Sequence, residues 1–133
     1  MSSVVKILPH YTYAEYEQWE GHWELIEGIA YAMSPSPVPR HQQIAANLLI
    51  EFGVPLKQCN KCRVYQPLDY HITDDTILQP DMLVVCREIT KKYLDFPPAL
   101  VAEVLSPATA LKDRHTKYSL YESQGIKYYI IIS

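Results

Sequence analysis

Residues 78–86 read LQPDMLVVC, in which a proline and an aspartate stand directly before an unbroken apolar run. The run Met82–Cys86 is typical of a strand that is buried on both faces of a sheet. A second run of this kind, Leu100–Leu105, contains Glu103. A buried carboxylate is costly unless it is paired or bound to a cation, so Asp81 and Glu103 both require a partner.

The residues before the first apolar run predict a helix and a further strand. Apolar side chains from about Pro39 to Phe52 fall at the spacing of one helical face, and Gly53 and Pro55 are expected to end the helix. Residues 63–72 then alternate between apolar and polar side chains, which predicts a strand. The polar sequence TDDT that follows predicts a turn.

The residues after the second apolar run predict a helix and a last strand. The helix is expected over about residues 109–123, with Leu111, Tyr118 and Tyr121 facing inward, and the strand over KYYIII. The order helix, three strands, helix, strand predicts an α/β sandwich around a mixed central sheet. An exposed apolar edge favours aggregation, so we expect a second subunit, as in a homodimer, to cover the last strand.

Two smaller elements are expected near the N-terminus. Thr12 and Glu15 form a capping-box pattern for a short helix, and Gly21 is expected to end it. In WELIEGIAYAM two apolar runs flank Glu27-Gly28, which predicts a tight hairpin. A chain of 133 residues fits one domain, so we expect a single domain over residues 1–133.

The composition is that of an ordinary globular protein and limits the class of partner. Hydrophobic residues make up 48% of the chain and charged residues 20%, with a net charge of −3 at pH 7. Nucleic-acid binders usually carry a basic surplus, so a DNA or RNA role must rest on a local patch or on a metal. No apolar stretch approaches the roughly 18 residues of a membrane helix, and the N-terminus does not resemble a signal peptide.

The three cysteines predict free thiols in a reducing compartment, the cytoplasm. Cys59 and Cys62 form a C-x-x-C, which is half of a zinc site at most. His71 and Cys86 complete it only if the fold brings them together. The simpler interpretation is that the cysteines are free, with Cys86 as a buried small hydrophobe.

Asp81 and Glu103 converge if their two strands are neighbours. Two carboxylates in a partly dry pocket repel, so one takes up a proton or both share a cation. Mg²⁺ prefers oxygen ligands and keeps several waters when one or two carboxylates hold it. Such an ion would activate a water beside a substrate phosphate. The alternatives are a turn-and-cap role for Asp81 and an arginine partner for Glu103.

Two further residues are candidates for the same pocket. Lys117 lies four residues before Tyr121 on the helix that follows Glu103. A lysine packed over the sheet could orient the attacking water or stabilise phosphate oxygens, whereas a surface lysine would have no such role. Glu24, in the predicted hairpin, is a further acid.

The segments WELIEGIAYAMSPSPVPRHQQI, QPDMLVV and VAEVLSPATALKDRHTKYSLYESQGIKYYII, in this order, resemble the Uma-type putative restriction endonucleases of the PD-(D/E)XK nuclease superfamily. The resemblance extends from about Tyr13 to the end of the chain. It implies a restriction-endonuclease-like core of order α-β-β-β-α-β, and a nuclease that acts on DNA with Mg²⁺ or Mn²⁺. Family members usually continue for further strands, so we expect a member that is shortened at its C-terminal end.

The resemblance also assigns candidate residues. Pro80-Asp81 matches the PD element and Glu103 the acid of the second element, and both are implied metal ligands. Glu24 matches an acid in the family's early hairpin. His41 matches a histidine after the family's SP-containing loop, although a histidine there could simply satisfy the start of a helix.

One position departs from the superfamily pattern. Two residues after Glu103, where the superfamily has lysine, this chain has Leu105. Lys117, in D-x-x-x-K-x-x-x-Y, matches a lysine that the family carries on its helix. Two hypotheses follow: a metal-dependent nuclease in which Lys117 assists the water, and a catalytically inactive nuclease fold that binds nucleic acid or a protein.

Overall fold

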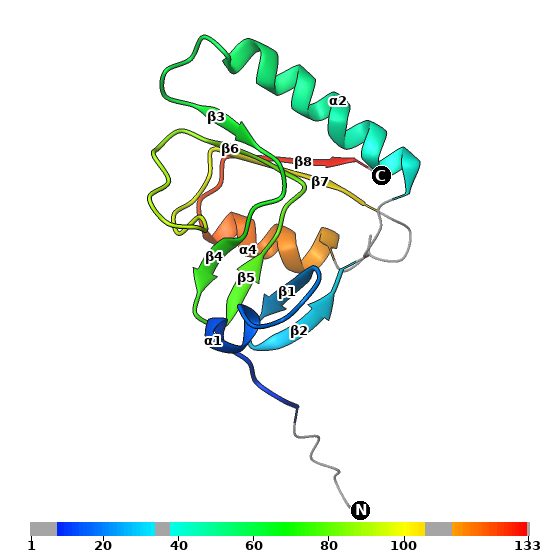
Figure 1. Cartoon of the computed structure of the whole chain (residues 1–133), viewed down its shortest axis with the longest axis vertical. Coiled ribbons are helices and arrows are strands. Elements are labelled where there is room, and N and C mark those ends of the chain that lie inside the picture. Colours follow the sequence, from blue (N-terminus) through cyan, green and yellow to red (C-terminus); the bar gives the residue numbers. More distant parts are fainter. Residues whose placement is uncertain (1–7, 34–37, 106–112, 133) are drawn as a thin grey trace, which may run out of the picture.

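The computed structural model describes residues 8–33, 38–105 and 113–132, and the strands in this part form two four-stranded sheets (Figure 1). The central sheet has the order β3-β6-β7-β8. Its strands are β3 (Arg63–Tyr65), β6 (Met82–Val85), β7 (Leu100–Val104) and β8 (Tyr128–Ile132). Neighbouring strands are antiparallel except for β7 and β8, which are parallel. The central sheet is therefore mixed, as predicted.

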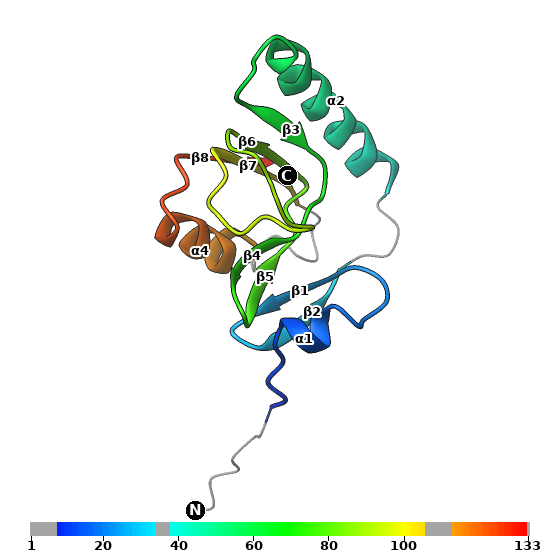
Figure 2. The same ribbon diagram turned by 60° about the vertical axis from the view of Figure 1, so that its left-hand side comes forward.

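Helices lie on the two faces of the central sheet (Figures 1 and 2). The long helix α2 (Pro39–Leu56) covers one face. The short helix α4 (Tyr118–Ser123) lies on the other, directly after a π-helical segment, η1 (Asp113–Lys117). The chain order α2, β3, β6, β7, α4, β8 is the predicted order of helix, three strands, helix and strand.

The alternation of side chains along β6 and β7 decides which residues meet which helix. Met82 and Ala102 point toward α2 and pack against its apolar residues. Leu83 and Val101 point the other way, into the cluster that contains α4. Glu103 lies two residues after Val101, so its side chain is on the α4 face, inside the protein.

The second sheet packs on the α4 side and has the order β2-β1-β5-β4. Its strands are β1 (Trp23–Ile26), β2 (Ile29–Ala32), β4 (Tyr70–Thr73) and β5 (Thr76–Leu78). The hairpin prediction is confirmed, because Ile26 pairs with Ile29 across Glu27 and Gly28. Both turn residues have positive φ (48° and 81°), as two-residue hairpin loops of type I′ require.

The short N-terminal helix α1 (Tyr13–Tyr16) begins at the predicted capping box of Thr12 and Glu15. It ends at Tyr16 and not near Gly21. The predicted TDDT turn is confirmed, since Thr73 pairs with Thr76 across it. Helix α2 continues through Gly53 and Pro55 to Leu56, because a proline in the last turn removes one hydrogen bond of a helix that is already ending.

The prediction of one strand over residues 63–72 is wrong. Its first residues form β3 in the central sheet, and its last residues form β4 in the second sheet. Pro67 lies between them, and proline has no N–H group with which to continue a strand ladder. The three-residue strand β5 was not predicted. Its apolar residues lie shortly before Pro80 in the sequence, and three residues are too few to show the alternation of side chains that marks a strand.

The inward direction predicted for the second helix holds for Tyr121, which is buried. It fails for Tyr118, which is 49% exposed. Leu111, and the predicted start of this helix at residue 109, lie outside the described residues. Within the described ranges, no helix is both long and apolar enough to cross a membrane.

The cysteine prediction is wrong for two of the three residues. Cys62 and Cys86 form a disulfide, and Cys86 is exposed, whereas Cys59 has a free thiol. The pairing of β3 with β6 places Cys62 and Cys86 opposite each other at the end of the ladder, which no spacing in the sequence reveals. The cysteine count therefore gives no support for a reducing compartment. His71 lies in the second sheet, away from this ladder.

Candidate active site

The centre of the candidate site is the ammonium group of Lys117, which two carboxylates hold. Its Nζ lies 2.6 Å from Glu24 Oε2 and 3.0 Å from Glu103 Oε1. The Tyr121 hydroxyl also donates to Glu103 Oε1, at 2.8 Å. Glu24 and Glu103 are 2% exposed and Lys117 is 1% exposed. Charges so deeply buried are tolerated because they are paired and hydrogen-bonded.

Three separate elements supply this cluster. Glu24 comes from β1 of the second sheet, Glu103 from β7 of the central sheet, and Lys117 from the last position of η1. Residues four apart on a helix lie on one face, so Lys117 and Tyr121 reach Glu103 together. The backbone N–H of Gln79 donates to Glu24 Oε2 at 2.8 Å and orients that carboxylate.

Asp81 lies at the mouth of this cluster. The register of β6 and β7 places it opposite Glu103, just before β6 begins. Asp81 Oδ2 accepts the backbone N–H of Val104 at 2.7 Å, which holds the carboxylate against β7. Asp81 Oδ1 lies 3.2 Å from His41 Nε2, on the first turn of α2. Helix α2 thus contributes a histidine from the opposite face of the sheet.

The electrostatics of the site reflect an excess of buried carboxylates. Burial raises the pKa of Glu103 to about 8, against the attraction of Lys117, and the charges of Glu24 and Asp81 raise this pKa further. Burial likewise raises the pKa of Asp81, against the hydrogen bond from Val104. Three carboxylates share one ammonium group, so the site favours either a bound proton or a second cation.

The chemical type of the available ligand atoms suits a hard divalent cation. Asp81 and Glu103 offer carboxylate oxygens from adjoining strands, which are the ligands that Mg²⁺ and Mn²⁺ prefer. In the described part of the chain, no three His, Cys, Asp or Glu side chains are grouped so that they could hold a metal. An ion held by these two carboxylates would therefore keep water in its remaining positions, as Mg²⁺ commonly does.

The five predicted site residues lie in two adjoining groups: Glu24, Lys117 and Glu103 in the buried cluster, and Asp81 with His41 at its mouth. The side chain of Leu105, in the superfamily's lysine position, is buried among the core residues and brings no charge. Lys117 instead brings an ammonium group to Glu103 from the helix. The catalytic roles of the five residues remain predictions.

Sequence reasoning missed two members of the site. Tyr121 was predicted to face inward and to belong to the D-x-x-x-K-x-x-x-Y motif but was given no role in the site, although its position four residues after Lys117 places both on one helix face. No feature of the sequence indicates the role of Gln79. It holds Glu24 through its backbone N–H, a group that every residue except proline possesses.

The comparisons with known proteins agree with this architecture. No curated protein matches the chain. Among solved structures, the chain is similar to a putative nuclease of DUF820 from Anabaena variabilis ATCC 29413. The two share 19% sequence identity with a TM-score of 0.76, over 91% of this chain and 73% of that one, which shows a common, restriction-endonuclease-like fold. The family model Uma2, described as a putative restriction endonuclease, matches residues 13–133. The chain therefore belongs to the Uma2 family.

Proposed function

We propose that this protein hydrolyses phosphodiester bonds of nucleic acid, with DNA as the substrate and Mg²⁺ or Mn²⁺ as the cofactor. The observation that carries the proposal is the buried cluster of Glu24, Lys117 and Glu103 with Asp81 at its mouth. Membership of a family described as restriction endonucleases supports the choice of reaction. The common fold with a putative nuclease is compatible with it.

The proposed roles follow from the contacts. Asp81 and Glu103 would hold the cation, which supplies an activated water and stabilises charge on the phosphate. Lys117 Nζ, beside Glu103, would donate to the attacking water or to a phosphate oxygen. Glu24 would position Lys117 by accepting from its ammonium group, and His41 would orient Asp81 through its Nε2.

Cleavage of supercoiled plasmid and of labelled oligonucleotides, with Mg²⁺ or Mn²⁺ and with a chelator, tests this function. We expect Asp81→Asn and Glu103→Gln to lower the rate at least about 100-fold, since even ligand-supporting residues of metal sites cost 10–100-fold. Asp95→Asn is the matched control, because the Asp95 carboxylate lies in an exposed ion pair with Lys91, outside the candidate site. Equal nicking by wild type and Asp81→Asn would reveal a contaminating nuclease and remove the proposal.

A non-catalytic nucleic-acid-binding or protein-binding role is the second candidate. Leu105 in the lysine position favours it, as does the enclosure of Lys117 between two carboxylates. Thermal unfolding with increasing Mn²⁺ separates the two candidates. A metal site raises the melting temperature in wild type but not in Glu103→Gln, since only the folded state binds the ion. No shift in wild type favours the binding module.

We further propose that the chain forms a homodimer through β8. In the described part of the chain β8 is an edge strand that pairs only with β7, and its residues Tyr128 and Ile131 are exposed. Pairing of two such edges would cover both. Sedimentation equilibrium tests this, and a monomer at all accessible concentrations would contradict it.

A further inference from the structure

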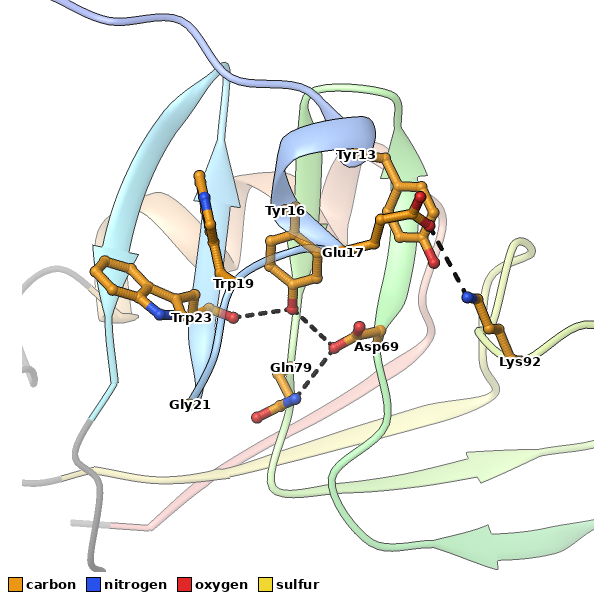
Figure 3. A pocket seen from close by; sticks show the side chains of 9 residues that line it. All are labelled: Tyr13, Tyr16, Glu17, Trp19, Gly21, Trp23, Asp69, Gln79 and Lys92. Atoms are coloured by element: carbon orange, nitrogen blue, oxygen red, sulfur yellow. Dashed lines mark hydrogen bonds and ion pairs between the residues drawn. The ribbon is translucent and has the colours of Figure 1, made fainter.

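A cavity lies beside β1, and its described lining includes none of the five candidate site residues (Figure 3). We call it the tryptophan pocket, because Trp19 and Trp23 both line it. Its volume is about 250 Å³, which is below the roughly 300–1,000 Å³ typical of sites for drug-sized ligands. A single planar ring system is therefore the kind of group that it can hold.

Gln79 forms a wall between the pocket and the site. Its backbone N–H donates to Glu24 of the buried cluster at 2.8 Å. Its side-chain amide lines the pocket and donates to Asp69 Oδ1 at 3.1 Å. Asp81 follows two residues later. Gln79 thus contacts both the pocket and Glu24, the carboxylate that is proposed to position Lys117.

Four of the nine residues that line the pocket are aromatic: Tyr13, Tyr16, Trp19 and Trp23. The ring centroids of Trp19 and Trp23 are 5.4 Å apart, and those of Tyr16 and Trp19 are 5.8 Å apart. All three side chains are half-buried and line the cavity. Aromatic faces of this kind stack on nucleobases irrespective of sequence.

The polar groups of the pocket are fixed by hydrogen bonds among themselves. The Tyr16 hydroxyl lies 2.9 Å from Asp69 Oδ1 and 3.0 Å from the carbonyl oxygen of Trp23 (Figure 3). Asp69 and Gln79 therefore present a carboxylate and an amide side by side. Amide and carboxylate groups recognise base edges, through exocyclic amines and ring nitrogens.

The charged residues of the pocket favour a neutral ring inside the cavity and a phosphate outside it. Asp69 and Glu17 line the cavity, and their negative charges disfavour a phosphate inside it. Lys92 is an exposed cation at the rim, 3.9 Å from Glu17. The pocket is thus suited to a neutral planar ring, with the negatively charged backbone of the ligand outside.

We propose that the tryptophan pocket binds one unpaired nucleobase of the nucleic-acid substrate, next to the phosphodiester that is presented to the active site. The choice of ligand rests on the proposed function. A base reaches such a pocket only from a single strand or by leaving its duplex, at a cost in unstacking and unpairing. The protein is therefore expected to prefer single-stranded or locally unpaired substrates over intact duplex.

Tryptophan fluorescence reports on this pocket alone, because Trp19 and Trp23 are the two tryptophans of the chain. The test titrates the wild-type protein, with a chelator so that no cleavage occurs, with AMP, CMP and ribose 5-phosphate, and with one oligonucleotide as single strand and as duplex. We expect the nucleotides and the single strand to quench the emission. Ribose 5-phosphate and the duplex are expected to leave it nearly unchanged. Equal responses to AMP and ribose 5-phosphate would overturn the proposal.

Variants then locate the binding. Trp19→Ala should weaken single-strand binding at least about tenfold, within the range found for loss of one stacking side chain. Trp19→Phe keeps a ring and should retain most of the affinity. Tyr118→Ala, which removes an exposed ring on α4, is the matched control and should bind as wild type does. If Trp19→Ala is unfolded by circular dichroism, Gln79→Ala takes its place with the same expectation.

The result is independent of catalysis. Base-dependent quenching by a protein that cleaves nothing would remove the proposed function and support the pocket as a base-binding site. Cleavage of DNA by a protein whose tryptophans do not respond to any base would overturn the pocket assignment and leave the proposed function in place.

Discussion

The Lys117 ammonium lies 3.0 Å from Glu103 Oε1, although the two residues are 14 positions apart and belong to different elements. In the superfamily pattern, a lysine two residues after this acid on the same strand supplies a positive charge. Here the ion pair with Lys117 brings the positive charge to Glu103 from another element. Here that neighbouring position is Leu105, which is buried among apolar residues. The ammonium group of a lysine therefore lies beside Glu103 although that lysine is not on the strand of Glu103.

Replacement of Lys117 by methionine should destabilise the fold strongly. It leaves Glu24 and Glu103 buried beside each other without a counter-charge, and breaking one side of a buried ion pair typically costs about 3–5 kcal/mol. Urea denaturation followed by circular dichroism measures the change. Lys91→Met is the control and should leave the midpoint unchanged, since its ion pair is exposed. A loss no larger for Lys117→Met than for the control would contradict the structure.

Stability should depend on pH through Glu103. Its pKa is raised from 4.5 to about 8 in the folded chain, so between these pH values the folded state binds the proton more tightly than the unfolded state does. Stability from this group is therefore greatest below about pH 4.5 and is lost as the pH rises through about 8, by at most about 1.4 kcal/mol per pH unit.

Denaturation of wild type and Glu103→Gln between pH 5 and 9, with a chelator present, isolates this contribution. The difference in unfolding free energy, wild type minus variant, should fall as the pH rises. A difference that stays constant from pH 5 to pH 9 would show instead that Glu103 is already ionised in the folded protein over this whole range.

The disulfide predicts a definite count of reactive thiols. Alkylation of the unfolded, unreduced protein should modify only Cys59, and alkylation after reduction should modify Cys59, Cys62 and Cys86. Peptide mass spectrometry gives the sites. Modification of Cys62 or Cys86 without reductant would show that the pair is not bonded. The Cys62 backbone N–H lowers the pKa of the Cys59 thiol, so native Cys59 should be alkylated faster than a free cysteine at the same pH.

Two glycines should respond in opposite directions to alanine. Gly28 has a φ of 81°, and a Cβ atom there would overlap the His10 ring, so Gly28→Ala should lose at least about 1–2 kcal/mol of stability. Gly53 lies within α2 with open space around it, so Gly53→Ala should gain about 0.5–1 kcal/mol. Thermal denaturation of both variants checks this. A stabilised Gly28→Ala would argue against the hairpin turn.

The order of the core elements could be predicted because each is marked locally. The central strands are dense apolar runs, α2 has a helical period, and Glu27-Gly28 is a turn signal. The division into two sheets could not, since residues 63–72 keep one alternating pattern across Pro67 while the chain crosses between sheets. Partners of a strand are long-range relations that a local pattern does not contain.

The candidate site shows the same division. Asp81 and Glu103 could be predicted as site residues because a carboxylate beside or within a buried apolar strand is costly unless it has a partner. Lys117 and Glu24 are weak candidates from their positions alone and are supported by the family resemblance, to which the structure adds two ion pairs. The contacts from Gln79 and Val104 come from backbone groups, and these depend on how the chain folds and not on residue type.

The bridge that Lys117 forms between Glu24 and Glu103 also bears on how the protein matures. Glu24 belongs to the second sheet and Glu103 to the central sheet. Lys117 follows both in the sequence, so it is synthesised after them. A chain that has formed only the second sheet and strands β6 and β7 of the central sheet therefore lacks the counter-charge of both acids. Full burial of either acid is therefore favoured only once Lys117 is in place, so this bridge couples the assembly of the two sheets.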